Sequence, residues 1–448
     1  MKKKLYIETY GCQMNVADSE VVASVMGERN FEISENQEEA DVILVNTCSV
    51  RDNAEKRVWG RLRHLNSLKK NNKSLKLGLI GCMAERIGDE MLEDKVVDIV
   101  AGPDAYRDLP YLYDKAVEGA DAINVELTID ETYDSIIPKR MTEGISGFVS
   151  ITRGCNNFCT YCIVPYTRGR ERSRDPKDIL AEVRDMLKNG YKEVTLLGQN
   201  VDSYKWMEEG SNKPVRFHHL LEMVAQEDPT LRVRFSTPHP KDIKESVVKM
   251  IAKYPNICKH IHLPIQAGND EVLKRMNRKY TVEWYMNRVE MIRKHIPDCS
   301  ITTDAFCGFC GETEEQFQGT LDMMKWVHYD TAFMFKYSER PGTYAAKKLE
   351  DDVPEEVKGE RLTRMIDLQS KLSMESNEKD IGKIVEVLVE GPSKRSADDF
   401  CGRCSQNKMV VFPKQDAKVG EYVRVKVLRF TQTTLIGEMV EKIDAPTM

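Results

Sequence analysis

The chain has 448 residues and a net charge of −6, with 41% hydrophobic and 31% charged residues. At roughly 100–200 residues per domain this length predicts two to four domains, and the composition excludes a disordered chain. No run approaches the ~20 apolar residues of a membrane span, and Glu8 interrupts the apolar stretch that a signal peptide needs. We expect a cytoplasmic protein with no membrane partner, in which any RNA contact comes from local basic patches.

The first hundred residues alternate short apolar strands with helices, and Asp18 is the expected N-cap of the first helix. The order predicts a doubly wound parallel sheet in a first domain of residues 1–120. Strands are expected at 5–10, 42–46, 75–80 and 96–100, and helices at 19–29, 53–70 and 85–93.

One cysteine follows each of the first three predicted strands: Cys12, Cys48 and Cys82. We expect their thiols at one carboxyl edge of the sheet, where open α/β folds bind ligands. Three inert buried thiols are one interpretation, and zinc with an open position is another. Three soft thiolates without a nearby histidine favour a 4Fe–4S cluster with one open iron. Gly11 and Gly81 would let such a cluster approach the backbone.

A second group of cysteines, Cys155, Cys159 and Cys162, lies on one loop after a predicted connector at 103–144. The spacing C-x₃-C-x₂-C can hold three irons of a cube and leave the fourth bare, and it differs from zinc-knuckle and ferredoxin spacing. Alternating strands and helices predict a partial barrel of six βα units within a second domain, residues 141–372. Its strands are expected at 147–152, 193–198, 231–236, 260–265, 300–306 and 331–337, and its helices at 176–189, 216–227, 241–254, 281–296 and 314–328.

Four arginines follow the cysteine loop, at Arg168, Arg170, Arg172 and Arg174. A solvated charged face and a patch that tracks a phosphate backbone are both consistent with this run.

The last part of the chain, after a helix expected at 355–371, predicts a small β-barrel at residues 375–441. Arg424, Lys426 and Arg429 would form a basic patch beside Phe430, or an ordinary solvent-exposed face. The strands are expected at 381–389, 409–413, 422–430 and 434–439.

The loop C-x₃-C-x-Tyr-C after the first barrel strand resembles the radical S-adenosylmethionine (SAM) superfamily. With YGCQMN and NTCSVR around Cys12 and Cys48, it resembles the methylthiotransferases, and the C-terminal barrel resembles the RNA-binding TRAM domain. Matching text covers nearly the whole chain, at residues 10–15, 46–51, 196–201, 263–268, 276–281 and 337–343. QMN at 13–15 and VR at 50–51 look most like the branch that acts on dimethylallyladenosine in tRNA.

The resemblance implies two 4Fe–4S clusters. Cys155, Cys159 and Cys162 would hold the cluster whose bare iron chelates SAM, and Cys12, Cys48 and Cys82 would hold an auxiliary cluster that carries the sulfur. Tyr161 would lie near the adenine of SAM, while Gln199, Asn200 and Gln266 would line the SAM pocket.

The implied reaction is sulfur insertion into tRNA. One SAM would methylate sulfur on the auxiliary cluster, and a second would yield a 5′-deoxyadenosyl radical that takes hydrogen from C2 of N(6)-dimethylallyladenosine at position 37, next to the anticodon. An electron donor such as flavodoxin or ferredoxin and a sulfur source would be partners of a monomer. The alternatives are a threonylcarbamoyladenosine tRNA or ribosomal-protein substrate, or a non-catalytic RNA-bound iron–sulfur redox protein.

Two further C-x-x-C pairs, Cys307 with Cys310 and Cys401 with Cys404, would by themselves suggest zinc or a thioredoxin-like couple. They fall in different predicted domains, and the family usually carries Pro at the place of Cys310 and Thr at the place of Cys404. We therefore interpret both pairs as substitutions without a metal. Cys258 and Cys299 are expected in the core.

Overall fold

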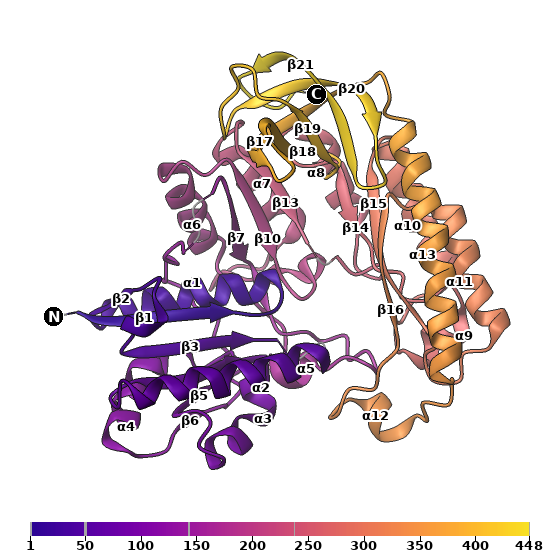
Figure 1. Cartoon of the computed structure of the whole chain (residues 1–448). Coiled ribbons are helices and arrows are strands. Elements are labelled where there is room, and N and C mark those ends of the chain that lie inside the picture. Colours follow the sequence, from indigo (N-terminus) through magenta and orange to yellow (C-terminus); the bar gives the residue numbers. More distant parts are fainter. Residues whose placement is uncertain (1, 49–51, 142–143, 237, 448) are drawn as a thin grey trace.

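The computed structural model describes residues 2–48, 52–141, 144–236 and 238–447, with the backbone alone for residues 52–56. Three parts follow one another along the chain: an N-terminal sheet, a split barrel and a C-terminal barrel above it (Figure 1). Within the described ranges, no helix is both long enough and apolar enough to cross a membrane.

The N-terminal sheet has six parallel strands in the order β2-β1-β3-β4-β5-β6. Apolar cores lie on both of its faces, one formed with α1 and α4 and the other with α2 and α3, so the predicted doubly wound sheet is confirmed. The strands β2 and β6 were not predicted because each has only one buried residue and leaves no apolar run, unlike the equally short β5, which is buried throughout. The elements are β1 (Lys3–Thr9), α1 (Gln13–Glu28), β2 (Phe31–Ile33), β3 (Val42–Thr47), α2 (Asp52–Ser67), β4 (Lys76–Gly81), α3 (Cys82–Glu93), β5 (Ile99–Ala101), α4 (Leu109–Glu118) and β6 (Ala122–Asn124).

Asp18 is not an N-cap, and this prediction is wrong. Cys12 occupies the N-cap position of α1, and Asp18 lies inside the helix with 1% of its surface exposed. Its carboxylate forms ion pairs with two arginines of the central part, Arg153 and Arg168. An interior position is tolerated because these pairs replace the solvent that a buried carboxylate loses.

The central part has the six predicted strands, but they form two three-stranded parallel sheets. Only the bridge between Val233 and Ile257 joins them in the described part of the chain, so the partial barrel is split along one side. The sheets are β13-β10-β7 and β14-β15-β16, from β7 (Ser146–Ser150), β10 (Glu193–Leu197), β13 (Arg232–Phe235), β14 (His260–His262), β15 (Ser300–Cys307) and β16 (Thr331–Lys336). The helices are α5 (Val164–Thr167), α6 (Pro176–Lys188), α7 (Phe217–Glu227), α8 (Glu245–Lys253), α9 (Asp270–Arg275), α10 (Val282–His295), α11 (Glu314–Val327) and α12 (Tyr344–Lys348), with two short ribbons, β8 (Thr152–Arg153) with β9 (Arg172–Ser173) and β11 (Lys205–Trp206) with β12 (Val215–Arg216).

The long helix α13 (Glu355–Glu378) leads from the split barrel into a closed C-terminal barrel with the strand order β17-β18-β19-β21-β20. The strand β18 was not predicted from the sequence. The strand is mostly polar, and only alternate side chains, such as Phe400 and Cys404, point inward. Arg424 of the predicted basic patch is paired with Glu441 at 2.6 Å and with Glu386 at 3.6 Å, which balances its charge. The strands are β17 (Ile384–Ser393), β18 (Ser396–Cys404), β19 (Met409–Pro413), β20 (Tyr422–Phe430) and β21 (Thr434–Ile443).

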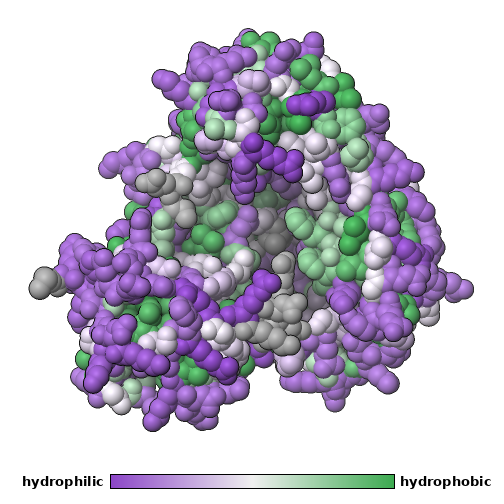
Figure 2. All heavy atoms as spheres, viewed as in Figure 1, coloured by the Kyte–Doolittle hydropathy of each residue, from purple (hydrophilic) through white to green (hydrophobic). Residues whose placement is uncertain are grey.

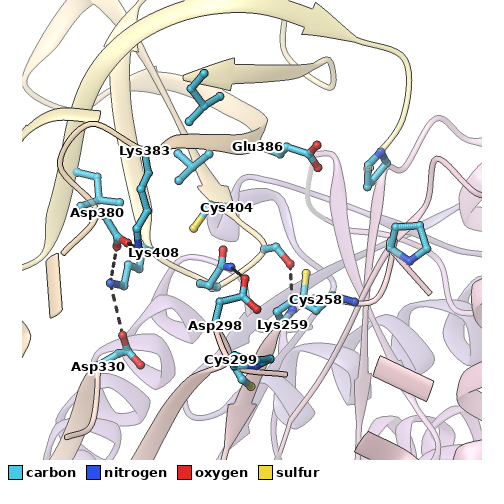
Figure 3. Close-up of a pocket in the computed structure, with 18 of the residues that line it drawn as sticks. Cys258, Lys259, Asp298, Cys299, Asp330, Asp380, Lys383, Glu386, Cys404 and Lys408 are labelled. Carbon is cyan, nitrogen blue, oxygen red and sulfur yellow. Dashed lines mark hydrogen bonds and ion pairs between the residues drawn. The ribbon is translucent and has the colours of Figure 1, made fainter. Parts of the chain in front are cut away.

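A cavity of about 950 Å³ separates the C-terminal barrel from the amino ends of the central strands. Figure 3 shows Lys408 reaching across it, with Nζ 2.7 Å from Asp380 and 3.4 Å from Asp330. Cys258, Cys299 and Cys404 line this cavity, and Cys258 and Cys404 are buried. The ion pairs of Lys408 therefore help to seat the C-terminal barrel on the central part.

Candidate active site with two cysteine triplets

Cys12, Cys48 and Cys82 meet at the carboxyl ends of the neighbouring strands β1, β3 and β4. A hydrogen bond with Cys48, together with the charge of Arg168, lowers the pKa of Cys12 to about 6 and outweighs the partial desolvation of this thiol. Burial raises the pKa of Cys82, whose Sγ accepts a hydrogen bond from Arg168 Nε at 3.1 Å. Cys12 caps α1 and Cys82 begins α3, so the positive ends of two helix dipoles also face this group.

Buried asparagines position these strand ends. Asn15 Oδ1 accepts from Cys12 Sγ at 3.2 Å, while Asn15 Nδ2 donates to Asn46 Oδ1 at 3.0 Å and to Thr47 O at 3.2 Å. Asn46 Nδ2 in turn donates to Ser19 Oγ at 2.9 Å. The motif residues Asn15 and Asn46 thus act on the orientation of the triplet, whereas residues 49–51 of the second motif lie outside the described residues.

Gly11 and Gly81 both lie close against protein atoms, and their expected role in letting a cluster approach the backbone stays a prediction. At Gly11, with a φ of +136°, a Cβ atom would lie 2.6 Å from the Cβ of Cys48. At Gly81, with a φ of +89°, it would collide with the side chain of Asn46. Both positions require glycine because the backbone is left-handed and the neighbouring strand end lies against it.

The second triplet lies on the loop that follows β8. Backbone hydrogen bonds from Cys155 N to Gly169 O at 3.1 Å and from Cys162 N to Cys159 O at 2.9 Å hold this loop. Burial raises the pKa of Cys155 to about 11 and that of Cys162 to about 12. Such thiols favour a thiolate only beside a strong positive charge, which a bound metal supplies.

A buried guanidinium supplies part of that charge. Arg278 Nη1 donates to Cys159 Sγ at 3.3 Å and to Tyr161 Oη at 3.4 Å, while Arg278 Nη2 donates to Pro264 O at 3.3 Å. The ring of Tyr161 packs edge-on against Phe306, with centroids 5.1 Å apart. No spacing pattern selects Arg278 as a site residue, since this arginine lies more than a hundred positions from the cysteine that it contacts.

Both interpretations of the arginine run are wrong for three of its four members. Arg168, Arg172 and Arg174 are buried, and only Arg170 is exposed. Arg172 Nη1 lies 2.6 Å from Asp104 of the N-terminal part, and Arg174 Nη1 lies 2.8 Å from Glu182. Carboxylates therefore occupy the positions at which phosphates or solvent were expected.

Asp18 is the centre of this buried network. Its carboxylate lies 2.7 Å from Arg153 Nη1 and 2.8 Å from Arg168 Nη2. Burial alone would raise the pKa of Asp18, but the two guanidinium charges outweigh burial and lower it. Since Arg168 also contacts Cys82, one arginine of the central part connects both cysteine-bearing parts of the molecule.

A cavity of about 880 Å³ joins the two triplets, with Cys12 and Cys162 both in its wall. Figure 2 shows the molecule hollowed at its centre, between the three parts. The split barrel contributes Gln199, Gln266, Arg278 and Asp304 to the wall, and the C-terminal barrel contributes Arg403, Lys408 and Gln432.

Two of the residues predicted to contact SAM do not line this cavity, and their contact with SAM stays a prediction. Asn200 is 1% exposed and turns away to donate from Nδ2 to Asp242 Oδ2 at 2.8 Å. Tyr161, which was expected near the adenine of SAM, packs against Phe306 and accepts a hydrogen bond from Arg278. Among the described residues, the cavity wall holds Gln199 and Gln266 but neither of these two.

Comparison with known proteins assigns each part of the chain. Residues 149–324 match the radical SAM superfamily, residues 4–102 match the uncharacterized protein family UPF0004, and residues 378–440 match the TRAM domain. The chain is 58% identical over 442 residues to the tRNA-2-methylthio-N(6)-dimethylallyladenosine synthase of Parabacteroides distasonis, covering 98% of this chain and 96% of that protein. The synthases of Porphyromonas gingivalis and Bacteroides fragilis are 57% and 56% identical, each with 98% of this chain and 96% of the relative covered. The chain belongs to this synthase family.

Solved structures agree on the fold. The radical SAM methyltransferase TsrM from Kitasatospora setae, with cobalamin and a [4Fe–4S] cluster bound, superposes with a TM-score of 0.59 at 14% identity over 77% of each chain. The cobalamin-dependent radical SAM enzyme OxsB superposes at 0.54 and 12% identity, over 82% of this chain and 56% of that one. As a radical SAM methylthiotransferase, this synthase family member uses a 4Fe–4S cluster and SAM.

Proposed function

We propose that this chain converts N(6)-dimethylallyladenosine at position 37 of tRNA, next to the anticodon, to its 2-methylthio derivative in the cytoplasm. The observation that carries the proposal is the single cavity that has Cys12 of one triplet and Cys162 of the other in its wall. A reaction that takes sulfur from one site and a radical from another needs both sites open to the same bound base.

The two triplets suit two 4Fe–4S clusters. Cys155, Cys159 and Cys162 would hold the SAM-binding cluster, and Cys12, Cys48 and Cys82 would hold the auxiliary one. Across the described residues, no three His, Cys, Asp or Glu side chains lie close enough to hold one metal ion. A cube binds each thiolate to a different iron and so accepts wider spacing than zinc, whose ligands all lie about 2.3 Å from a single ion. When bound, the clusters and SAM supply the radical, the sulfur and the methyl group.

The chain's own residues position these groups and exclude water. Arg278 and Arg168 donate to one sulfur in each triplet, which orients the sulfur and offsets its negative charge. Gln199 and Gln266 are in the wall of the cavity and would face SAM. Arg403 and Gln432 place the TRAM domain on the same cavity, where it would contact the RNA around the target.

The proposal includes a small electron donor such as flavodoxin or ferredoxin, a separate sulfur source, and a monomeric enzyme. The donor is required because reductive cleavage of SAM consumes one electron, and the sulfur source because each turnover removes one sulfur.

The test is anaerobic turnover of the reconstituted protein with an anticodon stem–loop that carries dimethylallyladenosine. We expect the 2-methylthio product together with 5′-deoxyadenosine, both detected by mass spectrometry. Parallel reactions with a threonylcarbamoyladenosine stem–loop and with a ribosomal protein should give no product. A reversible redox couple without any consumption of SAM would contradict the proposal and indicate an electron carrier.

A further inference from the structure

The wall of the central cavity contains two buried polar atoms, His239 Nε2 and Gln266 Oε1, that have no hydrogen-bond partner among the described residues. Each of the two residues is only 6% exposed. Buried polar atoms in native proteins are satisfied in the great majority of cases, and those that are not deserve a specific explanation. A bound ligand in this cavity would satisfy both.

His239 is a fixed hydrogen-bond donor. Its Nδ1 accepts from the backbone N–H of Lys241 at 3.2 Å, so the hydrogen of the neutral ring lies on Nε2. The ring packs edge-on against Tyr280 at 5.7 Å, and Tyr280 Oη is anchored on Ile265 O at 2.7 Å. Burial, with the charges of Arg278 and Lys241, lowers the pKa of His239 to about 2. The ring therefore stays neutral near pH 7 and donates without transferring a proton.

The backbone that carries the Gln266 amide is held in one conformation. Its backbone has a φ of +69°, in the left-handed region that non-glycine residues rarely adopt. Two hydrogen bonds to the β15 segment hold this conformation, from Gln266 N to Asp304 O at 3.0 Å and from Phe306 N to Gln266 O at 2.8 Å. Backbone strain of this kind persists where the surroundings determine it, and such positions cluster at ligand-binding sites.

We propose that His239 and Gln266 bind the edge of an adenine base in this cavity, His239 Nε2–H donating to a ring nitrogen and Gln266 Oε1 accepting from the exocyclic N6–H. Adenine places a ring acceptor beside that N–H, and the dimethylallyl substituent still leaves one hydrogen on N6. The inference rests on the proposed function, in which SAM and the target nucleoside both carry adenine. The test therefore measures the binding of SAM and of the target nucleoside separately.

The decisive variants separate the donor from the packing of the ring. His239→Phe keeps an aromatic ring against Tyr280 but removes the donor, and His239→Gln restores an N–H near the position of Nε2. Gln266→Met removes the acceptor. His219→Phe is the matched control, because Nδ1 of His219 also accepts from a backbone N–H, that of Arg216 at 3.2 Å, but this histidine is exposed on α7.

Dissociation constants are measured on the cluster-loaded holoenzyme, for SAM by calorimetry and for the dimethylallyl stem–loop by fluorescence anisotropy. His239→Phe and Gln266→Met should each weaken one of the two ligands by about tenfold, the effect of one lost buried hydrogen bond. His239→Gln should recover most of the affinity, and His219→Phe should match the wild type. Weakening of SAM alone assigns its adenine to the site, and weakening of the RNA alone assigns the target base.

Unchanged affinity for both ligands in His239→Phe, with intact clusters and an unchanged melting temperature, overturns the inference. Should that variant not fold, 1-deaza and 7-deaza forms of each adenine are titrated against the wild type, and full affinity for all four overturns it equally. Failure of the proposed function would show as wild-type enzyme that makes no methylthio product. The binding measurements do not depend on turnover, so the two failures are distinguishable.

Discussion

The two cysteine triplets are assembled in opposite ways. Cys155, Cys159 and Cys162 belong to one short loop, whereas Cys12, Cys48 and Cys82 come from three strand ends of a parallel sheet. Each triplet nevertheless has a buried arginine on one sulfur, Arg278 at 3.3 Å and Arg168 at 3.1 Å.

The two arginines differ in what balances them. Arg278 is held by carbonyl and hydroxyl oxygens, while Arg168 shares the carboxylate of Asp18 with Arg153. The auxiliary site is thus completed by an ion pair between two parts of the molecule. A site formed within one loop therefore depends on local geometry, whereas a site formed across a sheet also depends on how the central part of the chain docks on that sheet.

The largest effect is expected at the loop triplet. Cys155→Ala should abolish the cleavage of SAM, because the cluster that reduces SAM loses one of its three ligands. The measurement is 5′-deoxyadenosine formed under dithionite, with iron content as the control for loading. Cleavage at the wild-type rate would show that this loop does not hold the SAM-binding cluster.

The strand-end triplet should separate the two halves of the reaction. Cys82→Ala is expected to retain SAM cleavage and to make no methylthio product, because the radical site lies on another loop. Mass spectrometry of both products from one reaction mixture tests this. If Cys82→Ala formed the product as wild type does, the assignment of the auxiliary cluster would be wrong.

Asp18→Asn should destabilise the protein by about 3–5 kcal/mol at pH 7, because it removes the carboxylate that two buried guanidinium groups share and leaves Arg153 only a 4.0 Å contact with Asp104. The lowered pKa of Asp18 means that its carboxylate stabilises the fold above the unfolded-state pKa of about 3.9. That contribution is lost as the pH falls through the folded-state pKa.

The free energy of unfolding of the apo-protein is therefore measured in urea at several pH values, for the wild type and for Asp18→Asn. The difference between wild type and Asp18→Asn should be large at pH 7 and shrink below about pH 4. Glu208→Gln, which breaks the exposed ion pair with Lys177, is the control and should change nothing measurable. A difference that is independent of pH would show that the charge of Asp18 is not what stabilises the network.

The smallest effects come from one glycine in each site. Gly11→Ala and Gly154→Ala both place a Cβ on left-handed backbone, at φ values of +136° and +73°, and should each destabilise the fold by about 1–3 kcal/mol. Gly11→Ala should lower iron loading of the auxiliary site, and Gly154→Ala that of the loop site. Iron and sulfide counts with electron paramagnetic resonance distinguish loading of the two sites. Equal loss of iron from both sites in either variant would show that the glycine does not act on its own site alone.

Much of the fold followed from local pattern. The strand ends at Cys12, Cys48 and Cys82 and the six central strands were predicted from apolar runs and their spacing, since burial of a strand or helix face leaves a periodic trace. The failures have a common cause. Asp18 resembled an N-cap and Arg168, Arg172 and Arg174 resembled a surface patch, because charged residues are usually exposed unless a distant partner neutralises them.

The order of residues alone supplies the ligand atoms: two sets of three thiols, one on a single loop and one on successive βα units. The docking of separate elements brought Arg168 to Asp18 across 150 residues, turned Asn200 away from the cavity, and left His239 with an N–H that has no partner in the described part of the chain. The physical reason is that residue spacing reports contacts within one element, whereas charge pairing and burial are settled only when separate elements dock.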